Sequence, residues 1–142
     1  MSETSLTVHD TKVAVIVRSD LQTWQKLNVT AFLMSGIGAA YAEMIGQAYL
    51  DRDGRKFLAL SVQPVIVLSA DASLLSKVHQ RAVSRDVPAA AFIEEMFSTS
   101  DDVANREVFS RFALEDAKLA GIAVRAERSV VDKITKGASL RH

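Results

Sequence analysis

The sequence predicts a single α/β domain, and three observations support this fold class. Apolar runs typical of buried strands, at 13–17 and 65–68, are each followed by a segment with helical apolar spacing. A chain of 142 residues, 49% of them hydrophobic, suits one ordinary core. No repeat, low-complexity tract or interdomain linker divides it. We therefore expect residues 1–142 to form one domain, with residues 1–11 as a flexible polar leader.

Composition excludes several classes of function. The chain has no cysteine, which excludes disulfides and thiolate chemistry. Its histidines, His9, His79 and His142, lack the spacing of metal ligands, and His79 is expected on a helix surface, so we expect no metal and no cofactor. No apolar run reaches the ~20 residues of a bilayer span, and residues 1–12 do not resemble a secretory signal. The sequence predicts a soluble, cytoplasmic protein without a membrane partner.

Charge gives little support to a nucleic-acid partner. Seventeen basic and seventeen acidic residues leave no net charge, whereas nucleic-acid binders commonly carry a basic excess. Segment 94–116 is mainly acidic and segment 118–142 mainly basic. The basic segment is either a solvated face or a local patch for phosphate. Transfer RNA is therefore a weakly supported partner.

The first strand and helix lie in "KVAVIVRSDLQTWQKLNVTAFLMSG". Val13–Val17 is predicted to be a central strand, and Asp20 to cap the following helix, which ends near Gly36 or Gly38. One helical stripe is apolar, with Leu21, Trp24, Leu27, Ala31 and Met34. Because much of the opposite face is apolar too, we expect this helix to lie between the sheet and another surface, and we predict a homodimer.

The middle of the chain predicts a hairpin and a second strand-helix unit. Gln47–Leu50 and Phe57–Leu60 flank a turn in which Gly54 can adopt positive φ, which indicates a β-hairpin. Pro64 then opens a strand at 65–68, and the helix after it is capped by Asp71 or Ser69.

The last third predicts two further strands and two helices. Val87–Ile93 is a strand, and the polar stretch "EEMFSTSD" after it is the loop best placed for function. Asp101 or Asp102 caps a short helix through Phe109. Leu119–Val124 is another strand, followed by a helix capped by Ser129 and ended by Gly137.

Several motifs resemble known families over residues 12 to about 140. "KVAVIVRSDL", "VPAAAFIEEMFST" and "LAGIAVRAERSVVDKITKGASL" are similar to the type II peptidyl-tRNA hydrolases. "SDLQTWQKLNV", "QPV", the Asn of "ANR" and "VDKITKG" resemble more closely the uncharacterised family called Domain of Unknown Function 2000, itself similar to that hydrolase fold. The resemblance implies three layers: a mixed, mainly parallel sheet of about four strands, flanking helices and a hairpin insertion.

The hydrolase resemblance implies three catalytic residues, Lys26, Glu95 and Thr99. Glu95 could act as the base toward water, Lys26 could stabilise the oxyanion, and Thr99 could donate hydrogen bonds. The motif is altered here, because Leu33 stands where the hydrolases carry a histidine and Glu95 replaces an aspartate.

Three more residues are predicted to bind a ligand: Arg18, Asp20 and Asn28. Arg18 either binds a carboxylate or phosphate or pairs with Asp20. Asn28 is an amide among apolar neighbours, so it is expected either to form hydrogen bonds within the protein or to contact a ligand. Trp24 could stack a base, or belong to the core or a dimer interface.

Two functions follow. One is a non-catalytic or highly diverged protein that binds a small or phosphate-bearing ligand, and the other is a hydrolase of peptidyl-tRNA or a related acyl ester.

Overall fold

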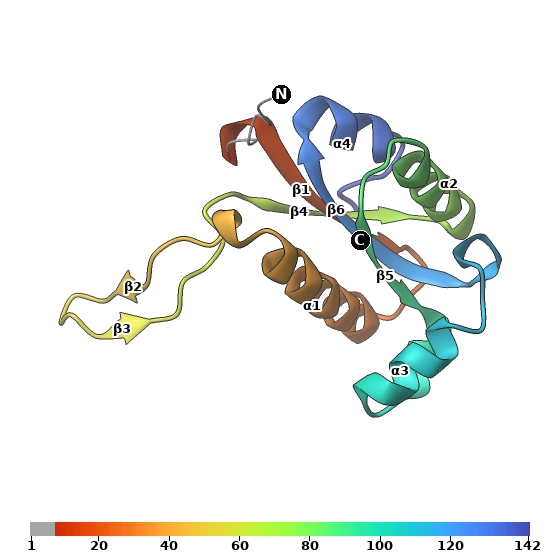
Figure 1. The fold of residues 1–142 in the computed structure, drawn as a ribbon, viewed down its shortest axis with the longest axis horizontal. Helices are drawn as coiled ribbons and strands as arrows, with labels where there is room; N and C mark the ends of the chain where they lie inside the picture. The colour runs from red at the N-terminus through yellow and green to blue at the C-terminus, as the bar shows by residue number, and fades with distance from the viewer. Residues whose placement is uncertain (1–7) are drawn as a thin grey trace, which may run out of the picture.

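A four-stranded mixed sheet forms the centre of the protein (Figure 1). The computed structural model describes residues 8–142. The strands are β1, Thr11–Arg18; β4, Val65–Ala70; β5, Ala89–Ile93; and β6, Leu119–Glu127. Their order is β4-β1-β6-β5, with β1 parallel to β4 and β6 antiparallel to both β1 and β5. Three of the four strands therefore run the same way, and the predicted mixed, mainly parallel sheet is confirmed.

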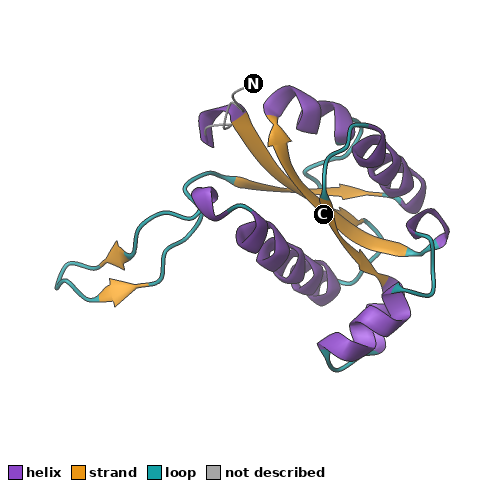
Figure 2. Cartoon of the chain, viewed as in Figure 1, coloured by secondary structure: helices purple, strands orange, loops and turns teal. Residues whose placement is uncertain are grey.

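Helices cover both faces of the sheet, which gives the predicted three layers (Figure 2). The long helix α1 lies on one face, and α2 and α4 lie on the other. The helices are α1, Thr23–Ala40; α2, Ala72–Ser84; α3, Asp102–Phe109; and α4, Arg128–Ile134. Short 3-10 helices are η1, Val8–Asp10; η2, Ala42–Met44; η3, Glu94–Ser98; and η4, Leu114–Asp116.

The central strand β1 supplies both cores. Successive side chains of a strand point to opposite faces. On one face of the sheet, Val13, Val15 and Val17 pack against α1. On the other face, Ile16 packs against α2 and α4. Residues 13–17 are fully buried, as the unbroken apolar run predicts.

Two of the predicted helix starts are correct and two are wrong. Asp71 caps α2, accepting a hydrogen bond from the Leu74 N–H at 2.8 Å, and Asp101 caps α3 in the same way. Asp20 does not cap α1, because its carboxylate pairs with Arg18; the α1 start uses the Gln25 side chain, which accepts from the backbone N–H of Gln22. At α4, strand β6 runs directly into the helix at Arg128, so Ser129 already lies inside it.

The predicted hairpin is confirmed, with shorter strands. β2, Tyr49–Leu50, pairs with β3, Lys56–Phe57, and the hairpin extends away from the body of the molecule (Figure 1). Its turn is closed by the Asp51 carboxylate, which accepts from the Arg55 backbone N–H at 2.9 Å, and Gly54 adopts a φ of 80°.

Two other expectations need correction. His79 is buried, because Leu75, Val78, His79 and Ala82 fall at i, i+3, i+4 and i+7 on the covered face of α2. The expected polar leader extends too far, since Thr11 is a buried residue of β1 and residues 8–10 form η1. The rest of the leader, residues 1–7, lies outside the described residues.

Candidate functional site

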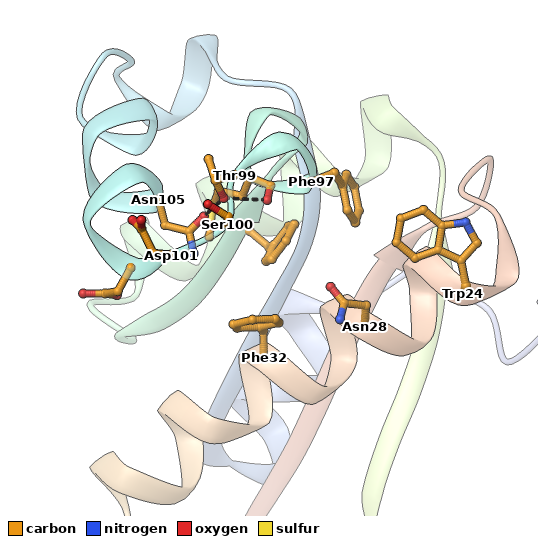
Figure 3. Close-up of a pocket in the computed structure, with 11 residues that line it drawn as sticks. Trp24, Asn28, Phe32, Phe97, Thr99, Ser100, Asp101 and Asn105 are labelled. Carbon is orange, nitrogen blue, oxygen red and sulfur yellow. Dashed lines mark hydrogen bonds between the residues drawn. The ribbon is translucent and has the colours of Figure 1, made fainter.

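A pocket lies between α1 and the segment η3–α3, and we call it the α1–α3 pocket (Figure 3). Trp24, Asn28 and Phe32 point into it because residues four apart share one face of a helix. Its volume is about 330 Å³. The lining residues are Trp24, Asn28, Phe32, Phe92, Met96, Phe97, Thr99, Ser100, Asp101, Asp102 and Asn105.

Four aromatic rings form one side of this pocket. Trp24 meets Phe97 edge-on at a centroid distance of 5.8 Å, and Phe97 lies 5.0 Å from Phe92. Phe32 continues the series, 5.9 Å from Phe92. Only Phe92 is fully buried, whereas Trp24 remains 55% exposed. The chain of ring contacts fixes the wall while leaving ring surface open to solvent.

The opposite side of the pocket is polar. The Thr99 hydroxyl donates to the Met96 carbonyl oxygen at 2.9 Å and also contacts the Asn105 amide (Figure 3). Asp101 is engaged as the α3 cap, and Asp102 forms an ion pair with Arg106 at 2.7 Å. Among the described residues, these two carboxylates are the charged groups of the lining.

Asn28 lies between the two sides. Figure 3 shows its amide on the α1 face between Trp24 and Phe32, directed toward α3. No hydrogen bond joins this amide to any residue of the described part of the chain. Asn28 is exposed, so solvent can satisfy its amide. The structure therefore shows no structural hydrogen bond for Asn28 within residues 8–142, and a ligand contact stays a prediction.

The structure brings Asn28 and Thr99 together but places Lys26 elsewhere. Residues two apart on a helix are separated by about 200°, so Lys26 and Asn28 face opposite ways. Lys26 lines a groove between α1 and β4 with Thr23, Leu27, Thr30, Val67 and His142, which we call the α1–β4 groove. The expected catalytic set of Lys26, Glu95 and Thr99 is thus divided between separate surfaces.

Arg18 and Asp20 form an intramolecular pair at the end of β1. Their side chains meet at 2.6 Å, and Arg18 also contacts Glu94 at 3.3 Å and the Leu119 carbonyl oxygen at 3.1 Å. The hydrogen bond from Arg18 lowers the pKa of Asp20. Burial opposes the charge on Arg18, but the two carboxylates outweigh it and raise the Arg18 pKa. Most of the binding capacity of Arg18 is already used within the chain.

Glu95 lies in η3, four residues before Thr99, and does not line the pocket. Its Oε2 is buried and has no hydrogen-bond partner within residues 8–142. An unpaired buried carboxylate oxygen is costly, so this position is unusual for a residue with no role.

Sequence reasoning missed most of the pocket. The aromatic wall needs Phe92 and Phe97 to meet Trp24 across the fold, and helical spacing alone assigns Trp24 to the core or an interface. The available signal was the i, i+4, i+8 series of Trp24, Asn28 and Phe32, which places an amide between two rings. The described residues contain no cluster of metal-binding side chains, and none of their helices is long and apolar enough to cross a bilayer.

Fold and pocket together define a three-layer α/β protein with a small aromatic-walled pocket beside its first helix. The chain belongs to the family described as protein of unknown function (DUF2000), whose model matches residues 11–142. It is similar to the solved structure of a protein of unknown function from Agrobacterium tumefaciens str. C58, with 55% sequence identity and a TM-score of 0.91. That match covers 94% of this chain and 98% of the other. No curated protein matches the chain.

Family membership and the mixed α/β fold are therefore confirmed. The resemblance to peptidyl-tRNA hydrolases stays a prediction.

Proposed function

We propose that this protein is a non-catalytic binding protein for a small organic ligand, held in the α1–α3 pocket. The observation that carries the proposal is the position of the exposed Asn28 amide, set between Trp24 and Phe32 and opposite the Thr99–Asn105 pair. An aromatic wall with a few convergent polar groups is the usual composition of a small-molecule site.

The size and charge of the pocket narrow the ligand class. A volume of about 330 Å³ is near the lower end of the ~300–1,000 Å³ common for ligand sites, so the ligand is fragment-sized. The rings favour a planar or apolar group, and Asn28 can pair with an amide or hydroxyl on it. Because Asp101 and Asp102 are the charged lining residues, a neutral or cationic ligand fits better than a phosphate at this position.

The pocket lacks an assembled catalytic set, which supports binding without turnover. The Thr99 hydroxyl donates its proton to the Met96 carbonyl oxygen, and Lys26 faces away. No group in the lining combines a free base with a nearby cation to stabilise developing negative charge.

NMR titrations that follow the N–H chemical shifts of the protein, with three small molecules added in turn, test this function. We expect benzamide and benzylamine to shift the Trp24 indole N–H and the amides of η3 and α3, and phenyl phosphate to leave them unchanged. Asn28→Leu should weaken benzamide about tenfold, the factor expected for one lost hydrogen bond of ~1.4 kcal/mol. Gln80→Leu, at an exposed position of α2, is the matched control and should bind as the wild type does. Shifts that map outside the pocket, or equal affinity in both variants, would contradict the proposal.

Ester hydrolysis is the second candidate, and the unpaired Oε2 of Glu95 favours it. A carboxylate oxygen without a hydrogen-bond partner is free to accept a proton from a water molecule. The purified protein would then hydrolyse the ester of an acylaminoacyl-tRNA, releasing the acylamino acid and free tRNA. Glu95→Gln would abolish this release, whereas Glu107→Gln, on the exposed side of α3, would not. Absence of release above the buffer rate rejects this candidate and leaves the binding function.

A further inference from the structure

The hairpin forms an apolar arm, residues 45–62, that the rest of residues 8–142 leaves uncovered. Leu58 is 88% exposed, and large apolar side chains on both sides of the hairpin are each more than half exposed. These are Tyr49, Leu50, Phe57 and Leu60. Figure 1 shows the arm extending beyond α1 and the sheet, with both of its strands clear of the other elements.

The arm is ordered by its backbone and turn, not by a core. At its base the Gly46 N–H donates to the Leu60 carbonyl oxygen at 3.0 Å, and the Val62 N–H donates to the Met44 carbonyl oxygen at 2.8 Å. Neither hydrophobic core includes a residue of the arm. A two-stranded hairpin is at best marginally stable alone in water, so a preformed arm implies a surface that packs against it.

A complementary apolar surface exists on the same protein. The α1–β4 groove carries Leu27, 66% exposed, together with Val67 and the methyl groups of Thr23 and Thr30. Its volume of about 520 Å³ can receive two or three large side chains. The arm begins only after α1 ends and extends away from the body, so in this structure it does not occupy the groove of its own chain.

The area of these surfaces reaches the lower end of what a stable dimer needs. Half-exposed Tyr, Phe and Leu side chains offer about 100 Å² each, so the two or three that the groove can receive bury roughly 250 Å² of one arm. Two arms and the two grooves that receive them then bury on the order of 1,000 Å², about the lower limit for a specific interface. Zero net charge removes long-range repulsion between copies.

We infer that two copies of this chain form a symmetric dimer in which the arm of each copy packs into the α1–β4 groove of the other. Such an exchange covers both apolar surfaces of both copies at once, and it satisfies the closed symmetry that homodimers adopt. The α1–α3 pocket lies on a different face of α1, so dimerisation leaves it open.

Light scattering on the full chain tests the dimer. We expect the wild type to have twice the chain mass of 15.5 kDa. Leu58→Lys in the arm and Leu27→Glu in the groove should each give a monomer, because either charge would be buried at the contact. Val83→Glu is the matched control, a comparably exposed apolar residue on α2, and should stay dimeric. A monomeric wild type, or a dimeric Leu58→Lys variant, would overturn the inference.

Mixing the two monomeric variants distinguishes arm exchange from other dimers. A mixed pair of Leu58→Lys and Leu27→Glu chains keeps one unaltered arm-groove contact. Its second contact brings the introduced lysine of one chain against the introduced glutamate of the other, and these opposite charges attract. We therefore expect the equimolar mixture to contain dimers that neither variant forms by itself. A mixture that stays monomeric would show that the arm does not pack into the groove, and the inference would fail.

Discussion

At the scale of single residues, Gly121 determines how closely α1 approaches the sheet. A Cβ at this position would lie 2.6 Å from Val29 Cγ1 and 3.2 Å from the Ile16 carbonyl oxygen. We expect Gly121→Ala to lower the free energy of unfolding by about 1–3 kcal/mol, because extra volume in a packed core forces neighbours to move. Urea denaturation monitored by circular dichroism measures this change.

Gly36 provides the matched control for that measurement. It lies within α1, and its added Cβ would meet the Ala90 Cβ at 3.6 Å, an ordinary contact. Gly36→Ala should therefore raise the free energy of unfolding by up to about 1 kcal/mol, through its helix propensity. If both variants lose the same stability, close packing is not the reason for glycine at 121.

Single residues predicted the site only where the signal came from their immediate neighbours in the sequence. Asn28 stands out in the sequence because an amide is unusual in an apolar helical segment, and it does line the pocket. Lys26 was selected through resemblance, yet the helix turns it to the other side. The residues that share the pocket with Asn28, including Asn105, come from a distant segment, so no local pattern could have joined them.

At the scale of elements, α2 depends on its cap. The Asp71 carboxylate satisfies an N–H at the start of the helix, which has no partner within the helix itself. We expect Asp71→Ala to cost about 1 kcal/mol of unfolding free energy, again measured by urea denaturation. Ser129→Ala should change stability little, because α4 begins one residue earlier. A larger loss from Ser129→Ala would restore Ser129 as a cap.

The sequence predicts best those elements whose own residues carry a clear pattern, such as an apolar run or a turn glycine. Strands β1 and β4 are continuous apolar runs, and the hairpin turn carries Gly54, so all three were found near their observed positions. Helix starts were harder, because Asp20 is a good cap by type but Arg18 holds its carboxylate. The choice between cap and ion pair depends on where β1 ends in three dimensions.

At the scale of the whole molecule, sheet order creates the pocket. Strand β6, the last in sequence, inserts between β1 and β5. This places η3 and α3, which follow β5, beside the outer face of α1 (Figure 1). The two sides of the pocket, α1 and η3–α3, are far apart in the sequence and meet only through the strand order of the sheet. Composition and residue spacing therefore predicted the fold class but not the pocket.

We expect the body of the molecule to fold without the arm. Replacing residues 47–59 by Asn-Gly would close a two-residue hairpin on the backbone bonds at the arm base, and it removes no residue of either core. We expect the shortened chain to fold as a monomer with the circular dichroism of an α/β protein. Its thermal midpoint should not depend on protein concentration, whereas the midpoint of the full chain should rise with concentration, because a dimer is stabilised by mass action. A shortened chain that fails to fold would mean that the arm stabilises its own body, against the separation of arm and core on which the exchange depends.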